Sequence, residues 1–187
     1  MSQVQSRFHS CKRQASDVIF RNAVVDDALC IGLLGMQVFL DTYATERIRD
    51  AIAQEALDSF SPQIIKELII KPGNLFAIAE INGHLIGFAH VTTKTSHTLI
   101  PDPNAAELKR LYIQERFTGY GIGWKLLQFA EEQARLHKAQ QLWASVWVAN
   151  QRALGFYPKQ GYSYIGSPTC TFQDETHENR LFSKALI

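Results

Sequence analysis

Residues Glu107–Leu127 read ELKRLYIQERFTGYGIGWKLL, a stretch that predicts a strand, a glycine-rich turn and the start of a helix. From Leu108 to Ile113 large side chains alternate in facing, which is the period-two pattern of a strand. Three glycines follow at every second position: Gly119, Gly121 and Gly123. From Trp124 onward, apolar residues recur at helical spacing: Leu126, Leu127, Ala130 and Ala134.

A strand that is followed by a glycine turn and a helix favours an anion-binding loop. Glycines adopt positive φ angles and allow an anion to approach the backbone closely. The unpaired N–H groups and the partial positive charge at a helix N-terminus make phosphate a suitable guest. A strand-to-helix turn without any ligand is the alternative, and the turn alone does not separate the two.

Two common phosphate loops do not fit the spacing of these glycines. A nucleoside-triphosphate loop ends in Gly-Lys-Ser/Thr, whereas Lys125 lies between Trp124 and Leu126. A dinucleotide loop needs a third glycine three positions after the second, and Trp124 occupies that position after Gly121. Neither chemistry is therefore expected here.

Composition and charge restrict the class of protein. The chain has 187 residues, enough for one domain, with 19 Lys and Arg against 18 Asp and Glu. This near-neutral balance gives no reason to expect a nucleic acid or an anionic membrane as a partner. The three cysteines lack metal-like spacing, which favours free thiols and a cytoplasmic location. The longest apolar run, Ala28–Leu40, is shorter than the roughly 20 residues of a membrane-spanning helix.

Strand and helix patterns predict a single α/β (α+β) domain at residues 17–187, preceded by a disordered arm at residues 1–16. The expected strands are 17–23, 75–81, 85–93, 107–113, 142–148, 162–170 and 180–186. The expected helices are 26–40, capped by Asp26 or Asp27, 45–70 with a break at Ser61-Pro62, one from 124 onward, and 151–157. Asn82-Gly83 predicts a hairpin turn. The order is β-α-α-β-β-β-α-β-α-β-β, in a mixed sheet of about seven strands flanked by helices.

Two segments resemble the GNAT superfamily of acetyl-CoA-dependent N-acyltransferases. Arg116-x-x-Gly119-x-Gly121 is similar to the pyrophosphate loop of that family. Residues Leu142–Gly161, LWASVWVANQRALGFYPKQG, resemble the family's strand followed by Asn-x-x-Ala-x-x-Phe-Tyr and a glycine turn. The element order is also the family's, so the resemblance implies the GNAT fold. Asp41-Thr42-Tyr43, the Trp-rich strand and the closing strand pair resemble the bacterial spermidine/spermine N-acetyltransferase branch.

The resemblance implies acetyl-CoA as the cosubstrate and no metal. The strand edge that hydrogen-bonds the pantetheine arm in the family corresponds to Leu111, Tyr112 and Ile113. The pyrophosphate loop corresponds to Arg116, Thr118, Gly119, Tyr120, Gly121, Ile122, Gly123 and Trp124. Across the gap between the strands, the pantetheine contacts correspond to Asn150, Ala153 and Phe156. Thr118 stands where the family often has a basic residue, so weaker charge compensation is expected there.

The resemblance also implies two catalytic residues. Tyr157 is expected to protonate the departing thiolate, because a phenol of pKa about 10 can donate to a thiolate of pKa about 8.5. A core tyrosine beside Phe156 is the alternative, and Pro158 departs from the family and should end the helix at Tyr157. Glu107 is the expected general base, acting directly or through water. A solvated carboxylate at the strand edge is the alternative for Glu107.

The acceptor is expected between the first two helices and the last hairpin. The first region also holds Arg47 and Arg49, but acidic residues on both walls favour a cationic primary amine, a polyamine included: Asp41, Glu46, Asp50, Glu55, Asp58, Asp174, Glu175 and Glu178. Solvated helix and loop faces are the alternative. A protein or peptide N-terminus is a second acceptor class, and a non-catalytic acyl-CoA sensor is a second class of function.

Several histidines and aromatic residues carry weaker expectations. The histidines at 84, 90, 97 and 177 lack metal-like spacing and are expected at the surface or in hairpins. The tryptophans at 124, 143 and 147 are expected to pack in the core or at an interface. Aromatic residues near Phe172 and Trp147 are compatible with a homodimer.

Overall fold

The computed structural model describes residues 17–172 and 175–186, and at 170–172 and 175 it describes the backbone only. The arm predicted at residues 1–16 lies outside the described residues. Within them, no helix is both long and apolar enough to cross a membrane.

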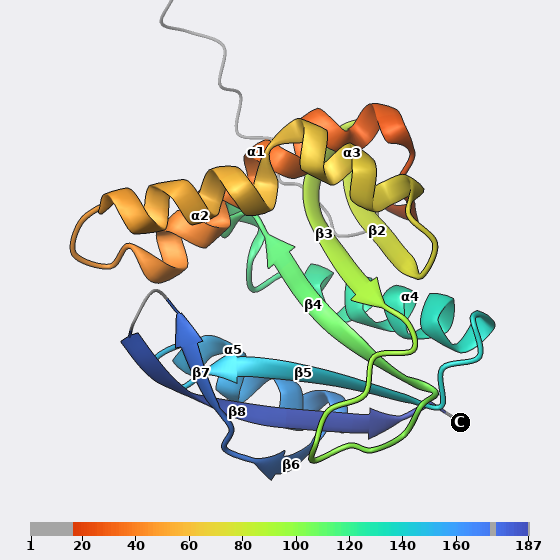
Figure 1. Cartoon of the computed structure of the whole chain (residues 1–187). Coiled ribbons are helices and arrows are strands. Elements are labelled where there is room, and N and C mark those ends of the chain that lie inside the picture. Colours follow the sequence, from red (N-terminus) through yellow and green to blue (C-terminus); the bar gives the residue numbers. More distant parts are fainter. Residues whose placement is uncertain (1–16, 173–174, 187) are drawn as a thin grey trace, which may run out of the picture.

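A mixed sheet runs through the centre of the domain (Figure 1). Its strands are β1 (Val18–Asn22), β2 (Asn74–Ile81), β3 (His84–Thr92), β4 (Ala105–Ile113), β5 (Gln141–Trp147), β6 (Ser163–Gly166), β7 (Thr169–Phe172) and β8 (Glu175–Ala185). In space their order is β1-β2-β3-β4-β5-β8-β6, and β7 pairs with β8 beside this path. Only β4 and β5 are parallel neighbours among the described strands; the other pairs are antiparallel.

Helices cover both faces of this sheet (Figure 1). One face carries α1 (Ala28–Tyr43), α2 (Asp50–Phe60) and α3 (Pro62–Ile70). The other carries α4 (Ile122–Leu136) and α5 (Gln151–Phe156). Short 3-10 turns join the elements: η2 (Val25–Asp27), η3 (Glu115–Phe117) and η4 (Tyr157–Gln160).

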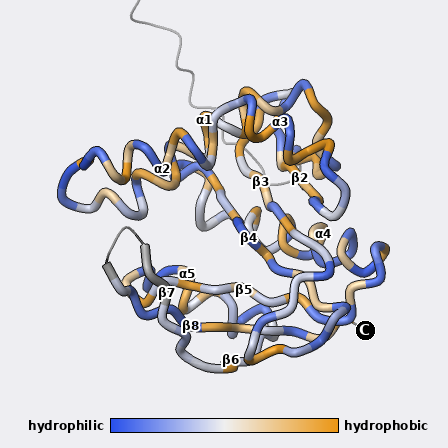
Figure 2. The backbone as a smooth tube through the Cα atoms, viewed as in Figure 1, coloured by the Kyte–Doolittle hydropathy of each residue, from blue (hydrophilic) through white to orange (hydrophobic). Residues whose placement is uncertain are grey.

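The alternation of side chains along the strands divides the core into two main clusters. Phe76, Ile78 and Phe88 point to the side of α1–α3, where they meet Ile31 and Phe60. The alternate strand residues pack against α4 and include Ala77, Ala79, Ala89, Val91 and Leu108. Figure 2 shows hydrophobic segments in both the helices and the strands, while the connection between α1 and α2 is mostly hydrophilic. That connection is therefore available to contact a polar ligand.

The predicted architecture is confirmed, with differences at its ends. The segment predicted as one strand at 162–170 forms both β6 and β7, separated by Ser167-Pro168, because proline has no N–H for a strand ladder. The helix predicted from residue 45 begins at Asp50, and α1 continues to Tyr43. The sheet therefore has one strand more than predicted in the described residues.

The expected cap of the first helix is wrong in detail. Neither aspartate side chain caps α1. Instead, the Asp27 carboxylate accepts a hydrogen bond from the Val24 N–H at 2.8 Å and is held by two Arg21 nitrogens at 2.7 and 2.9 Å. The Arg21 guanidinium keeps the pKa of Asp27 below its usual value. Asp27 thus joins the short turn η2 to the edge strand β1.

Two local signals in the sequence are confirmed. Asn82 and Gly83 both have positive φ, 51° and 74°, and turn β2 into β3. Ser61-Pro62 separates α2 from α3, with Pro62 in the first turn, although the Ser61 side chain makes no capping hydrogen bond.

Candidate active site

A wedge opens between β4 and β5. The two strands pair over only three positions, Ala105 with Gln141, Ala106 with Leu142 and Glu107 with Trp143. Beyond these, both strands continue without pairing to each other, while the opposite edge of β4 stays paired with β3 as far as Ile113. The wedge-facing backbone of β4, which includes Leu111, Tyr112 and Ile113, is therefore open to hydrogen bonds from an extended ligand.

A β-bulge occurs at the start of this open edge. His90 pairs with Arg110 and Val91 with Leu108, so Lys109 is the extra residue on β4. Bulges turn the local backbone and change the direction of its N–H and C=O groups. Here the bulge lies where β4 leaves β5.

The glycine loop connects the end of β4 to α4. Gly119 and Gly121 have positive φ angles of 80° and 77°, and Gly121 is the residue before the first helical turn. A Cβ atom at either glycine would meet no atom within 4 Å, so the space above the loop is open. The N–H groups of Ile122, Gly123 and Trp124 have no intrahelical acceptor, because they belong to the first turn of α4. The loop therefore presents backbone donors to an open space, which suits an anion.

The side chains of the loop divide into exposed and engaged groups. Arg116 is exposed and forms no ion pair with another described residue; its guanidinium carbon lies 6.0 Å from the centre of the Phe117 ring. Thr118 donates its hydroxyl hydrogen bond to the Glu115 carbonyl at 2.9 Å, so this hydroxyl is already used locally. Tyr120 and Trp124 are exposed, at 60% and 45%, and flank the loop.

The far side of the wedge is formed by α5 and the turn before it. The Asn150 side-chain oxygen accepts the Ala153 N–H at 3.0 Å and caps α5, which leaves its amide NH2 group as the donor for a ligand. The Phe156 ring approaches the first turn of α4, 4.0 Å from where a Cβ of Gly123 would lie. Arg152 joins α5 to η3 by donating to both carboxylate oxygens of Glu115, at 2.6 and 2.9 Å.

Tyr157 is buried directly after α5. Its ring packs against Phe156, Tyr162 and Phe182, at centre-to-centre distances of 5.4, 5.4 and 5.8 Å. Burial raises the pKa of Tyr157 above its usual value, and the neighbouring Tyr43 raises it further. The phenol therefore remains protonated at neutral pH and is a weaker acid than an exposed tyrosine; Tyr157 does not line the cavity between the α1–α2 connection and β5, and its role as a proton donor stays a prediction.

Tyr157 belongs to a group of three tyrosines from distant parts of the sequence. Burial raises the pKa of Tyr112 on β4, and both Tyr43 and Tyr157 contribute to that rise. Tyr43 ends α1 and stacks on Trp147, with ring centres 5.4 Å apart. Elements α1, β4 and η4 thus bring three phenols together beside the wedge.

Glu107 occupies a different place. Its carboxylate pairs with Lys109 at 2.6 Å, and it stands where β4 and β5 are still joined. Glu107 does not line the cavity between the α1–α2 connection and β5. Its role as a base stays a prediction.

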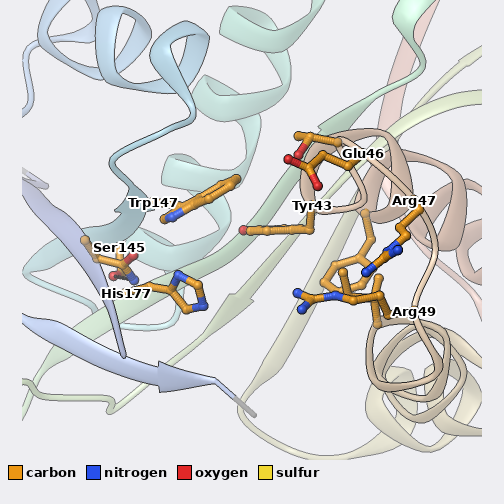
Figure 3. A pocket seen from close by; sticks show the side chains of 11 residues that line it. Tyr43, Glu46, Arg47, Arg49, Ser145, Trp147 and His177 are labelled. Carbon is orange, nitrogen blue, oxygen red and sulfur yellow. Dashed lines mark hydrogen bonds between the residues drawn. The ribbon is translucent and has the colours of Figure 1, made fainter. Parts of the chain in front are cut away.

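A cavity of about 440 Å³ lies between the α1–α2 connection and the strands β5 and β8 (Figure 3). One wall carries Tyr43, Glu46, Arg47 and Arg49, and the other carries Ser145, Trp147 and His177, as Figure 3 shows. The remaining lining residues are Phe39, Thr45, Ile52 and Asn179. The cavity occupies the position expected for the acceptor.

The lining differs from the expected acidic walls. Among the described acids only Glu46 lines the cavity, and Asp41, Asp50, Glu55, Asp58 and Glu178 do not. Asp174 and the Glu175 side chain lie outside the described residues. Two arginines, Arg47 and Arg49, accompany the single carboxylate.

Two aromatic residues, Trp147 and His177, line the cavity. The sequence predicts packing in the core or at an interface for Trp147, and a place at the surface or in a hairpin for His177. Trp147 meets His177 edge to face, with ring centres 6.1 Å apart. The signal that could have found Trp147 is its register: Ser145 and Trp147 lie on one face of β5, toward the open end of the wedge. The homodimer stays a prediction, because Trp147 serves the cavity and the Phe172 side chain lies outside the described residues.

Comparison with known proteins agrees with this geometry. The family model described as "Acetyltransferase (GNAT) family" matches residues 39–162. An uncharacterized N-acetyltransferase of the pepI 3'region of Lactobacillus delbrueckii subsp. lactis is 25% identical over 154 residues, which cover 82% of this chain and 89% of that protein. The spermine/spermidine N(1)-acetyltransferase of Bacillus subtilis is 28% identical over 85 residues, which cover 45% of this chain and 56% of that protein.

A solved structure supports the fold. The PaiA N-acetyltransferase of Thermoplasma acidophilum, in complex with coenzyme A, superimposes with a TM-score of 0.69 at 21% identity, over 88% of this chain and 97% of that chain. The family model covers more than half of the sequence, and the chain belongs to the GNAT family of acetyltransferases. It is an acetyl-CoA-dependent N-acetyltransferase, and its acceptor is a small molecule or a peptide. Within the described residues, no three His, Cys, Asp or Glu side chains gather as a metal site would require.

Proposed function

We propose that this protein transfers the acetyl group of acetyl-CoA directly to a primary amine held in the cavity beside Trp147. The observation that carries the proposal is the wedge between β4 and β5: the glycine loop follows β4, and the unpaired end of β5 carries Trp147, which lines the cavity. The open edge of β4 at Leu111–Ile113 would hold the pantetheine amides, as an added strand does. The loop at Gly119–Trp124 and the exposed Arg116 would hold the pyrophosphate.

In the reaction, the amine nitrogen bonds to the thioester carbon while the carbon–sulfur bond breaks. The nitrogen loses a proton to water or to a nearby base, and the departing thiolate gains one. Tyr157 is our candidate for supplying that second proton, because the family resemblance places a phenol here; its raised pKa keeps the phenol protonated but also makes it a weaker acid. A backbone N–H of β4 beside the bulge would stabilise the oxyanion, an effect worth around 3 kcal/mol.

A polyamine is the more specific acceptor suggested by the Bacillus subtilis relative, although that likeness covers less than half of this chain. The cavity offers a polyamine one described carboxylate, Glu46, and the aromatic faces of Tyr43 and Trp147. Aromatic rings attract cationic amines through their π faces. The two arginines of the cavity nevertheless oppose a polycation.

The experiment that tests the transfer is release of free thiol from acetyl-CoA in the presence of a panel of amines. For Tyr157→Phe we expect kcat to fall by about 10²-fold or more, with the KM for acetyl-CoA within about twofold of the wild type. The matched control is Tyr164→Phe, because Tyr164 is 56% exposed and lies on β6. An unchanged kcat for Tyr157→Phe would remove the phenol from the mechanism.

Calorimetric titration with CoA, combined with the thiol-release assay, distinguishes an enzyme from a non-catalytic sensor. Binding of CoA without thiol release for any amine would mean that the wedge holds the ligand but does not catalyse transfer. Absence of binding to both CoA and acetyl-CoA would contradict the proposal as a whole.

A further inference from the structure

The charge of the acceptor cavity is unevenly placed. The described lining contains one carboxylate, Glu46, and two guanidinium groups, Arg47 and Arg49, all on the α1–α2 connection. The facing wall is built from Ser145, Trp147, His177 and Asn179, with no carboxylate or guanidinium group among its described residues. Positive charge therefore gathers at the helical side of the cavity, away from β5.

Arg47 is the arginine available for a ligand. It is exposed, and it makes no hydrogen bond or ion pair with another described residue. Glu46, one position earlier, likewise has no described partner. Glu46 and Arg47 therefore form no ion pair with each other. A guanidinium group binds carboxylates through two parallel hydrogen bonds, which a polyamine cannot accept.

The opposite wall suits the reacting amine. Ser145 and Trp147 belong to β5, one side of the wedge through which the thioester would reach the cavity. The Asn179 amide donates a hydrogen bond to the Ser145 hydroxyl oxygen at 3.0 Å. The Ser145 hydroxyl can therefore still donate its own proton to a ligand, and its second lone pair can accept a hydrogen bond from a ligand. The amine would thus lie on the strand side and any anionic group on the arginine side.

From this arrangement we infer that the preferred acceptor carries a carboxylate in addition to its primary amine, as an amino acid or an acidic peptide does. Arg47 binds the carboxylate and orients the molecule, while the amine faces the wedge. Arg47 is a specificity-determining residue in this scheme, and it takes no part in the chemical step. The inference rests on the proposed function, because it assumes that acetyl transfer occurs in this cavity.

Amines matched with their carboxylated counterparts test the inference. Lysine with cadaverine, arginine with agmatine, and tryptophan with tryptamine differ only by the carboxylate, and spermidine is added for comparison. In the wild type we expect kcat/KM, measured by thiol release, to be about tenfold higher for the carboxylated member of the preferred pair. That factor corresponds to about one charge-assisted hydrogen-bonded contact in a partly open site. A short peptide with an acidic residue, tested beside the free amino acids, separates a peptide acceptor from a free one.

Substitution of the arginine supplies the second measurement. Arg47→Gln should remove most of the preference by lowering kcat/KM for the carboxylated substrate about tenfold, with less than about a twofold change for its amine. Lys66→Gln is the matched control, because Lys66 is exposed on α3, outside the cavity, and the substitution removes the same charge. Arg47→Lys should retain part of the preference, since it keeps the charge but loses the planar pair of donors.

Two outcomes overturn the inference while leaving the proposed function intact. In one, thiol is released, but kcat/KM for each amine equals or exceeds that for its carboxylated counterpart, or kcat/KM for spermidine equals or exceeds that for the carboxylated acceptors. In the other, Arg47→Gln lowers turnover of both members equally. Absence of thiol release with every acceptor is a different result, because it refutes acetyl transfer itself and the inference with it.

Discussion

Tyr43, Tyr112 and Tyr157 show how single residues shape the site. Tyr157 is buried and Tyr112 is half-buried, and loss of solvent raises the pKa of both phenols. Tyr43 contributes to both shifts and also lines the cavity. One side chain therefore connects the acceptor cavity to the buried phenol proposed as the proton donor.

The glycine loop allows a sharp test with a single methyl group. Gly121 has φ of 77°, and nothing lies within 4 Å of the position that a Cβ would take, so Gly121→Ala costs backbone strain rather than a clash. Such strain is roughly 1–2 kcal/mol in the free energy of unfolding. We also expect the KM for acetyl-CoA to rise about tenfold or more, because the methyl group occupies the space that the phosphate needs.

Gly83→Ala provides the control for this substitution. Gly83 has φ of 74°, also with nothing within 4 Å, and lies in the β2–β3 turn. Chemical denaturation should show a similar loss of stability for both variants, whereas steady-state kinetics should show a raised KM for Gly121→Ala alone. Equal KM values in the two variants would contradict a phosphate at the loop.

At the scale of elements, the close contact of α1 with the end of α2 positions one wall of the cavity. A Cβ atom on Gly32 would lie 2.4 Å from the Phe60 carbonyl oxygen, and one on Gly35 would lie 2.3 Å from the Phe60 ring. These glycines let α1 approach Phe60, which is almost fully buried. The end of α1 then carries Tyr43 and the connection with Arg47 to the edge of the cavity.

Gly32→Ala should disturb this wall. The backbone oxygen of Phe60 cannot rotate away, so α1 must shift, at a cost of about 1–3 kcal/mol in the free energy of unfolding. The KM for the acceptor should rise several-fold, while calorimetric affinity for CoA stays near the wild-type value. Gly155→Ala in α5 is the control for stability, since a Cβ there meets nothing within 4 Å and alanine favours a helix by roughly 0.5–1 kcal/mol.

For the whole molecule, a buried histidine on β3 contributes to the response to acid. His90 lies in the predicted hairpin, but it is only 2% exposed, unlike a surface residue. One ring nitrogen lies 2.8 Å from the Asn74 side-chain oxygen and the other lies 3.2 Å from an Arg110 nitrogen. Burial, together with the charges of Arg110 and Lys109, lowers the pKa of His90 to about 3. The folded protein therefore holds His90 neutral.

This lowered pKa predicts a loss of stability in acid. As pH falls from about 6.5 towards 3, the unfolded chain binds a proton at His90 while the folded chain does not. The free energy of unfolding then decreases by roughly 1.4 kcal/mol per pH unit from this residue alone. His90→Gln should flatten the decrease between pH 6 and 4, as measured by urea denaturation at each pH.

His84→Gln is the matched control for the acid effect, because His84 lies exposed at the turn end of the same hairpin. Its stability profile should follow the wild type. If His90→Gln also followed the wild type, His90 would not be the residue that titrates on unfolding.

Sequence patterns predicted the order of elements because their signals are local. The glycines at 119 and 121, the Asn82-Gly83 turn and the Ser61-Pro62 break act through their own φ preferences, which neighbours in space do not alter. The extra strand β7, the bulge at Lys109 and the pairing of Asp27 with Arg21 depend on how separate segments meet in space. Those features have no local signal.

By itself, the sequence determined the family fold and the glycine loop, since these lie in continuous segments with fixed spacing, and it predicts the residues that would hold acetyl-CoA. Only the tertiary structure decided which residues line the cavity that we propose for the acceptor. Tyr43, Arg47, Trp147 and His177 come from α1, the α1–α2 connection, β5 and β8. These segments are distant in the sequence and meet only in the folded chain, so no spacing along the chain encodes their proximity.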